Sequence, residues 1–301
     1  MTWQNSSYAL SMVEPSVCRA FSPGHITGFF EICNTPSLSC EKGSRGAGIN
    51  LSLGAFSTVH ITESSTQQID ILLNGKQSSA PVTRRAVHYL IGKHPFHVVA
   101  QVETQLPHGQ GFGMSAAGSL ATTLALGHLL HLPRKRAVEA AHCAEIDLKT
   151  GLGDVVAMSV GGIEIRVTPG IGGKIKAISG DGDLVLVVLG PQLWTRDILS
   201  NHSLQAQICR WGKKCTTELL ADPVLPRFFQ LSYRFVKQTG LASPVILEAL
   251  KIAQVYGRAS MCCLGNSIFC MGDTSQLLCV LKRYGPVFVC TIDTNGARLV
   301  P

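Results

Sequence analysis

Hydrophobic residues in the first third of the chain change spacing several times, and each change predicts a new element. Apolar residues alternate with polar ones over residues 57–64 and 68–73, which predicts two half-buried strands. Helical spacing over residues 82–91 predicts a helix, and renewed alternation over residues 96–102 predicts another strand. Strands on both sides of a helix indicate a fold that mixes the two kinds of element.

The rest of the chain continues this mixture without strict βαβ alternation. Helices are expected over Met114–His131, Pro133–Leu148 and Pro244–Tyr256, and strands over Gly161–Val167, Leu184–Leu189, Ser267–Met271, Leu277–Leu281 and Phe288–Ile292. This order predicts an α+β fold with two lobes. We place their boundary in a stretch rich in Gly and Pro, so that residues 1–168 form an N-terminal lobe and residues 169–301 a C-terminal lobe.

Composition and charge narrow the class of protein. Hydrophobic residues make up 46% and charged residues 15%, as in globular domains, and no apolar run is long enough to span a bilayer. The net charge of +7 suits nucleic acid or an anionic small molecule. Basic residues occur only in short runs without interleaved aromatics, which favours the small molecule. Met1–Ser11 lacks the pattern of a secretion signal, so we expect a cytoplasmic protein without membrane contact.

The 11 cysteines do not form a metal or disulfide pattern. No CxxC and no Cys/His cluster at zinc spacing occurs, and five of the cysteines lie in apolar runs in the last 40 residues. Free cysteine behaves as a small core hydrophobe in a reducing compartment. We therefore expect structural or incidental roles for these residues.

The strand over residues 96–102 runs into a turn with Gly109, Gly111 and Gly113 at alternate positions, and a helix follows. Glycines permit positive φ, so successive N–H groups can converge on an anion, and the helix N-terminus adds partial positive charge. The turn lacks the Lys-Ser/Thr pair of a Walker loop and does not open a first βα unit as a dinucleotide loop does. A phosphate site of another kind is the remaining interpretation.

Three motifs resemble those of the GHMP kinases, in the order of that family. Pro107–Ala117 (PHGQGFGMSAA) resembles the second motif, with Phe112 and Met114 in place of the usual Leu and Ser. Residues 22–28 (SPGHITG) resemble the first motif, and residues 264–269 (LGNSIF) correspond to the third without its usual run of glycines. The resemblance implies an ATP-dependent small-molecule kinase with an N-terminal lobe like ribosomal protein S5 domain 2 and a ferredoxin-like C-terminal lobe.

Within the family, residues 23–30, 43–48 and 150–156 resemble one archaeal subgroup. Its members transfer the γ-phosphoryl group of ATP to the 4-hydroxyl of pantoate in coenzyme A synthesis, and the resemblance implies the same substrate here. It also implies Mg²⁺ and a possible homodimer. Two alternatives stay open: another GHMP kinase, acting on homoserine, a mevalonate derivative or a sugar, and a catalytically silent relative that binds a ligand or nucleic acid.

The resemblance assigns the nucleotide and metal sites. The residues expected to bind ATP are those of the glycine turn, namely Pro107, Gly109, Gln110, Gly111, Phe112, Gly113, Met114, Ser115 and Ala116. A carboxylate must lie near such a turn to hold the metal that bridges the phosphates. Glu145 is the candidate ligand together with Ser115, and Asp147 is the alternative.

The remaining roles concern the substrate. Asp154, in a tight turn between glycines and valines, is expected to be the general base for the substrate hydroxyl, although a helix-capping role is compatible with the same position. Arg45 is the candidate for the substrate carboxylate because a guanidinium binds that group with two parallel hydrogen bonds. Ser44 and His25 are further substrate candidates, and Arg196 is a second cationic one. His25 stands where the family has Arg or Lys.

Overall fold

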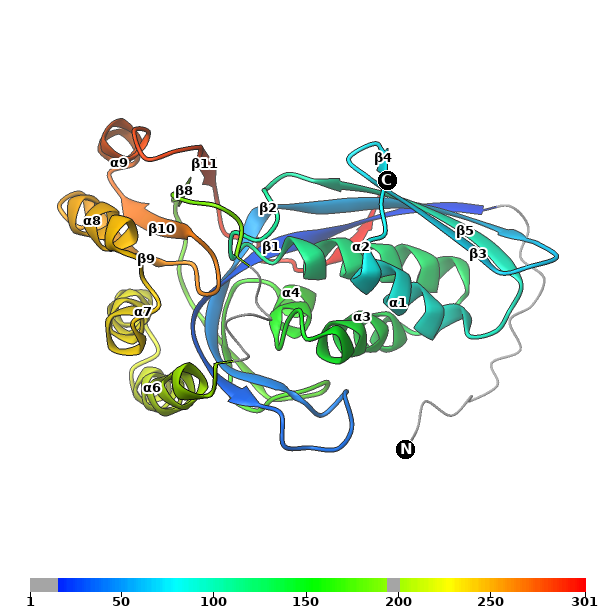
Figure 1. Ribbon diagram of the computed structural model, residues 1–301, viewed down its shortest axis with the longest axis horizontal. Coiled ribbons are helices and arrows are strands. Elements are labelled where there is room, and N and C mark those ends of the chain that lie inside the picture. Colours follow the sequence, from blue (N-terminus) through cyan, green and yellow to red (C-terminus); the bar gives the residue numbers. More distant parts are fainter. Residues whose placement is uncertain (1–15, 194–200) are drawn as a thin grey trace.

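Two long antiparallel strands, β1 (Ser16–Cys33) and β2 (Gly43–Glu63), form the centre of the larger sheet (Figure 1). The computed structural model describes residues 16–193 and 201–301, so Met1–Ser11 and Arg196 lie outside the described residues. Beside β2 lie β5 (Phe96–Thr104), then β3 (Gln68–Leu73), which is parallel to β5, and β4 (Lys76–Gln77).

Three further strands complete this sheet at different positions along β1 and β2. β6 (Ile163–Arg166) pairs with β2, and β7 (Ile175–Ile178) pairs with β6. β12 (Arg298–Val300) returns from the end of the chain to pair with β1. The sheet thus collects residues from both ends of the sequence.

Four helices cover one face of the larger sheet (Figure 1). They are α1 (Pro81–Ile91), α2 (Met114–Leu129), α3 (Arg134–Leu148) and α4 (Asp154–Val160). α2 lies against β1 and β2 and is buried along nearly its whole length, which explains its many small and apolar residues. The starts of α2 and α4 and the end of α3 come together on this side of the sheet.

A second sheet has the order β11-β8-β10-β9 and is antiparallel throughout. Its strands are β8 (Leu184–Val188), β9 (Gly257–Met261), β10 (Ser267–Gly272) and β11 (Val287–Cys290). Three helices, α7 (Leu225–Thr239), α8 (Pro244–Ala253) and α9 (Thr274–Leu281), lie against it, and α6 (His202–Ala221) packs against α7 and β1. Ser243 caps α8 by accepting a hydrogen bond from the Ile246 amide at 3.4 Å.

The predicted α+β class is confirmed, and most predicted elements occur near their expected ranges. The strand predicted over Leu277–Leu281 is wrong, because this stretch belongs to α9. The Asp273 side chain caps α9 by accepting from the Gln276 amide at 3.0 Å, and the two leucines are the buried residues at the i and i+4 positions. The division after residue 168 stays a prediction; β6 and β7, on either side of it, belong to one sheet.

In the ranges that the structure describes, no helix has the length and apolar character needed to cross a membrane. The cysteines are free, and Cys143, Cys215, Cys262, Cys263, Cys270 and Cys290 are buried, whereas Cys279 is exposed.

Candidate active site

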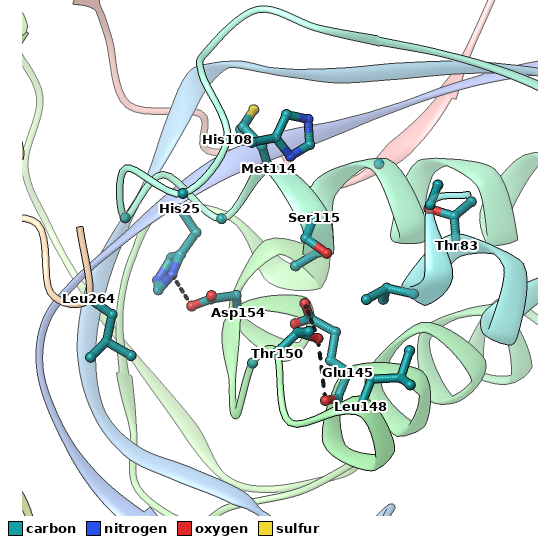
Figure 2. Close-up of a pocket in the computed structure, with 18 of the residues that line it drawn as sticks. His25, Thr83, His108, Met114, Ser115, Glu145, Leu148, Thr150, Asp154 and Leu264 are labelled. Carbon is teal, nitrogen blue, oxygen red and sulfur yellow. Dashed lines mark hydrogen bonds and ion pairs between the residues drawn. The ribbon is translucent and has the colours of Figure 1, made fainter. Parts of the chain in front are cut away.

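A cavity of about 560 Å³ lies between the glycine turn, the start of α2, the end of α3 and the start of α4 (Figure 2). Ser115, Glu145 and Asp154 line it, with His25 and Ser44 from the two central strands. His25 and Asp154 are 129 positions apart in the sequence, so the fold creates the site by bringing the three helix ends onto the sheet.

The glycine turn has the conformation that its composition predicts. Gly109, Gly111 and Gly113 have φ of 67°, 77° and 67°, the left-handed region that favours glycine. Gly113 is the N-cap of α2, so the positive end of a 16-residue helix begins at the cavity. Backbone amides and a helix N-terminus directed at a cavity are the groups that bind phosphate.

Not every predicted nucleotide-binding residue faces the cavity. Gly109, Gly111, Gly113, Met114, Ser115 and Ala116 line it, as does His108, which the sequence analysis did not single out. Pro107, Gln110 and Phe112 are not among the lining residues. Phe112 is 1% exposed and packs in the core, and the Gln110 amide nitrogen donates to the Gly190 carbonyl at 3.1 Å. These two side chains therefore support the glycine turn on the side away from the cavity.

Hydrogen bonds join the three motifs. The His25 amide of the first motif donates to the Phe112 carbonyl of the second at 3.0 Å. The Cys263 amide, beside the third motif, donates to the Thr27 carbonyl at 3.1 Å, and the Ser267 hydroxyl donates to the Gln110 carbonyl. The third motif thus holds the glycine turn in place, a contact that does not require a run of glycines in that motif.

Glu145 points into the cavity near Ser115 (Figure 2). It is 3% exposed, and its carboxylate accepts a long hydrogen bond of 3.5 Å from the Thr150 hydroxyl. Burial, together with the neighbouring charge of Asp154, raises the pKa of Glu145 to about 8. A Cβ at Gly151 would lie 2.2 Å from the Glu145 Oε2 atom, so glycine at 151 leaves the space that this carboxylate occupies.

The alternative metal ligand, Asp147, lies elsewhere. Its carboxylate accepts hydrogen bonds from the Ser39 hydroxyl at 2.5 Å and from the Tyr89 hydroxyl, in an exposed position. Asp147 is not among the residues that line the cavity. Of the two carboxylates, the geometry brings only Glu145 to the glycine turn.

Asp154 is the first residue of α4, and its side chain is 29% exposed at the cavity. Its Oδ1 atom lies 2.9 Å from the His25 Nδ1 atom and 3.4 Å from the Thr27 hydroxyl. Burial acts to raise the pKa of Asp154, but the hydrogen bond and charge of His25, with the charge of Arg166, outweigh it and lower that pKa below its ordinary value. Asp154 is therefore an ionised carboxylate at the cavity wall. Gly153 holds the N-cap position, so the capping interpretation does not describe the Asp154 side chain.

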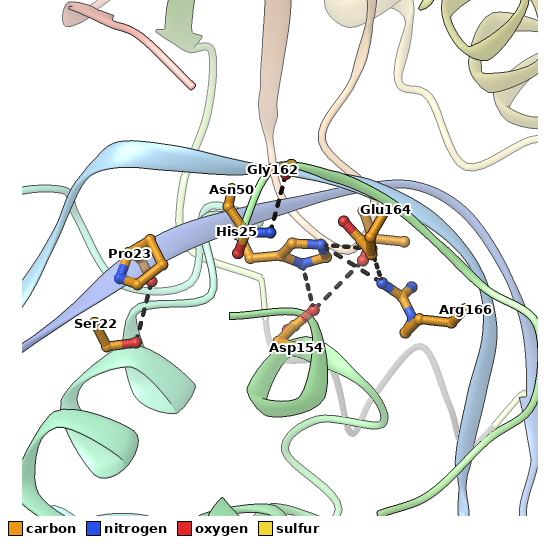
Figure 3. A network of polar contacts seen from close by, with 9 residues as sticks. Ser22, Pro23, His25, Asn50, Asp154, Gly162, Glu164 and Arg166 are labelled. Carbon is orange, nitrogen blue, oxygen red and sulfur yellow. Dashed lines mark hydrogen bonds and ion pairs between the residues drawn. The ribbon is translucent and has the colours of Figure 1, made fainter. Parts of the chain in front are cut away.

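Two buried charged residues on β6 belong to this site and escaped the sequence analysis. Glu164 accepts from the ring of His25, and Arg166 donates to Glu164 (Figure 3). Both are at most 2% exposed. The available signal was the alternation of these charged residues with Ile163 and Ile165, because opposite charges inside a buried strand are rarely tolerated unless paired.

Arg45 is not brought to the cavity. Its Nε atom donates to the Val167 carbonyl at 2.8 Å, and its Nη1 atom pairs with Glu31 at 3.2 Å. The glycines around it have other uses: a Cβ at Gly46, with φ 155°, would meet the Phe29 carbonyl oxygen at 2.2 Å, and one at Gly48 would meet the His25 Nε2 atom at 2.3 Å. The run between 43 and 48 thus admits β1 and the His25 ring. Ser44 does line the cavity, beside Gly153.

A glycine turn of the kind that binds phosphate, beside two acidic side chains, is typical of small-molecule kinases. Residues 81–162 match the family model described as GHMP kinases N terminal domain. A solved structure described as a phosphotransferase related to the CoA biosynthesis pathway superposes with a TM-score of 0.86 and 29% identity, covering 95% of this chain and 99% of that one.

Three curated relatives that match this chain carry the name pantoate kinase. The one from Methanocaldococcus jannaschii is 33% identical over 90% of this chain and 99% of its own length. The one from Thermococcus kodakarensis is 35% identical over 84% of this chain and 87% of its own. The chain therefore belongs to the pantoate kinases of the GHMP kinase family.

Proposed function

We propose that the protein phosphorylates the 4-hydroxyl of pantoate with ATP, giving 4-phosphopantoate and ADP. The observation that carries this proposal is the position of Asp154, an ionised carboxylate on the wall of the cavity that the glycine turn closes at one end. Family membership supplies the reaction class, and the names of the curated relatives supply the substrate.

The reaction requires few groups from the protein. The hydroxyl oxygen of pantoate forms a bond to the γ-phosphorus, the bond from that phosphorus to the β,γ-bridging oxygen breaks, and Asp154 takes the hydroxyl proton. The amides of the glycine turn and the N-terminus of α2 stabilise the charge on the phosphates. Because transfer through a loose transition state depends mainly on position and charge, a well-oriented carboxylate serves better than a strongly basic one.

We further propose that Mg²⁺ is held by Glu145 and Ser115. The donors fit this ion, since both present oxygen, and Mg²⁺ typically takes one or two protein ligands with substrate phosphates and water. Glu145 is buried at the cavity, and among the described residues its carboxylate accepts only a long hydrogen bond from Thr150, so its oxygens are available. When bound, the ion neutralises charge on the transferring phosphates.

We also propose that the two lobes resemble ribosomal protein S5 domain 2 and ferredoxin. The protein is proposed to act in the cytoplasm and to form a homodimer. Ser44 is the proposed direct contact to the substrate, because it lines the cavity beside Gly153, the residue before Asp154.

A substrate panel tests the function. ADP release with ATP and Mg²⁺ should depend on pantoate and be weak with homoserine, mevalonate or pantothenate, and the product should carry its phosphate on the 4-oxygen by ³¹P NMR. Equal turnover with any of those alternatives would contradict the pantoate assignment while leaving the kinase class intact.

A further inference from the structure

The ring of His25 is held between two carboxylates from different elements (Figure 3). Its Nδ1 atom lies 2.9 Å from Asp154 Oδ1 at the start of α4, and its Nε2 atom lies 3.1 Å from Glu164 Oε1 on β6. The side chain of His25 is completely buried. Arg166, also on β6, is the remaining charged group at the ring, with its Nη1 atom 3.5 Å from Nε2 and donating to the same Glu164 oxygen.

This arrangement determines how many protons the ring carries. A neutral imidazole has one N–H, so one of the two carboxylates would face a lone pair at hydrogen-bond distance. An imidazolium donates from both nitrogens and satisfies both carboxylates. Burial acts to lower the pKa of His25, but Glu164 and Asp154 outweigh it and raise that pKa to about 9. Geometry and charge agree on a doubly protonated ring.

The orientation of the ring is fixed as well as its charge. Gly48 lies on β2 in register with both Thr27 and Glu164, and a Cβ there would be 2.3 Å from His25 Nε2. The ring therefore occupies the space above a glycine, with one carboxylate at each nitrogen. It has no second position that would satisfy both contacts.

The charge and orientation of the His25 ring affect Asp154, the proposed general base. Both hydrogen bonds that Asp154 accepts, from His25 Nδ1 and from the Thr27 hydroxyl, go to Oδ1. Within residues 16–193 and 201–301, no hydrogen bond to Oδ2 occurs, so this oxygen is left for the substrate hydroxyl at the cavity. The positive ring also favours the ionised form of Asp154, the only form that accepts a proton.

We propose that Glu164 and His25 are positioning residues for the phosphoryl transfer: Glu164 keeps His25 as an imidazolium, and the imidazolium holds Asp154 ionised with Oδ2 toward the hydroxyl. This rests on the proposed function. It also explains how a histidine stands where the family has Arg or Lys. Those cations keep their charge unaided, whereas the charge of a histidine at neutral pH depends on a partner such as Glu164.

The first test needs no substrate. In protein labelled with ¹⁵N on histidine, the His25 signals, assigned by their loss in His25→Asn, should stay those of an imidazolium through pH 8. In Glu164→Gln they should titrate at least about one pH unit lower than in the unsubstituted protein. A titration unchanged by Glu164→Gln overturns the proposal, whether or not pantoate proves to be the substrate.

The second test separates charge from shape. Glutamine has the shape of glutamate and still accepts a hydrogen bond, so a merely structural Glu164 would lose little in Glu164→Gln and more in the shorter Glu164→Asp. We expect the reverse at pH 8: kcat down at least about tenfold in Glu164→Gln, less in Glu164→Asp, and a KM for ATP within about threefold in both. At pH 6 the Glu164→Gln deficit should shrink, because the ring is again protonated.

Two further variants complete the design. Asp70→Asn breaks the pair between Asp70 on β3 and His97 on β5, 2.8 Å apart in the same sheet, and should leave the pH profile unchanged. If Glu164→Gln does not fold, His25→Gln decides: the alkaline fall of kcat, expected near pH 9 in the unsubstituted protein, should be absent. An equal kcat deficit of Glu164→Gln at pH 6 and 8, or an alkaline fall that persists in His25→Gln, contradicts the proposal.

Discussion

Arg45 and Glu31 face each other across β1 and β2 and form an ion pair of 3.2 Å. Both side chains are mostly buried, with 27% and 18% exposed, and the Arg45 Nε atom donates to the Val167 carbonyl. To bind a substrate carboxylate, this arginine would have to leave both partners. The ion pair thus gives Arg45 a role in joining β1, β2 and the segment after β6.

Arg45→Ala should accordingly change the KM for pantoate by less than about threefold and lower the free energy of unfolding by about 1 kcal/mol. Steady-state kinetics and urea denaturation measure the two effects. Glu31→Gln, which removes the other half of the pair, should lower stability similarly. A tenfold rise in the pantoate KM alone, without loss of stability, would restore the substrate role that the sequence resemblance implied.

Asp154→Asn should lower kcat by about two to four orders of magnitude, because the amide cannot take the hydroxyl proton. The KM for ATP should stay within about threefold, since the glycine turn is untouched. Nucleotide binding measured by calorimetry provides the control. Near-normal turnover with intact ATP binding would remove Asp154 from the reaction.

Glu145→Gln and Asp147→Asn form a matched pair that locates the metal ligand. The Mg²⁺ concentration for half-maximal activity should rise at least about tenfold in Glu145→Gln, because a neutral amide binds a hard cation far more weakly than a carboxylate. Asp147→Asn should alter it by less than about twofold, since Ser39 and Tyr89 occupy that carboxylate away from the cavity. The opposite pattern would assign the metal to Asp147.

His142 should make the protein sensitive to acid. It is 1% exposed, its Nε2 atom donates to the Lys42 carbonyl at 3.0 Å, and burial lowers its pKa below the ordinary value. The unfolded chain therefore binds a proton at higher pH than the folded one, so stability falls as pH drops below about 6.5. His142→Gln keeps an N–H donor without titrating, and should lose less stability between pH 7 and 5 in urea denaturation. Equal losses would show that other groups cause the acid sensitivity.

The sequence was sufficient for the fold class and for several residues that the structure brings to the cavity. The glycine turn was recognised because its positive φ angles require glycine, and Glu145 and Asp154 because they follow it at the family's spacing. Long-range pairing could not be predicted in this way. Glu164 and Arg166 act through His25, about 140 positions earlier, and no local pattern records that contact. The same limit affected α9, where buried leucines fit a strand as well as a helix until the Asp273 cap decides.

Gly265 and Ser267 bear directly on the backbone of the glycine turn. A Cβ at position 265 would lie 2.1 Å from the carbonyl carbon of Gln110, and Ser267 donates to the Gln110 oxygen 157 residues away in the sequence. The ribosome must therefore have synthesised β10 before the glycine turn can adopt its final conformation. A nascent chain that ends before β10 should not bind nucleotide. In the finished protein, the amides of the turn should exchange with deuterium no more slowly than the opening of β10 allows. ATP should therefore bind only to a protein in which the last third of the chain has folded.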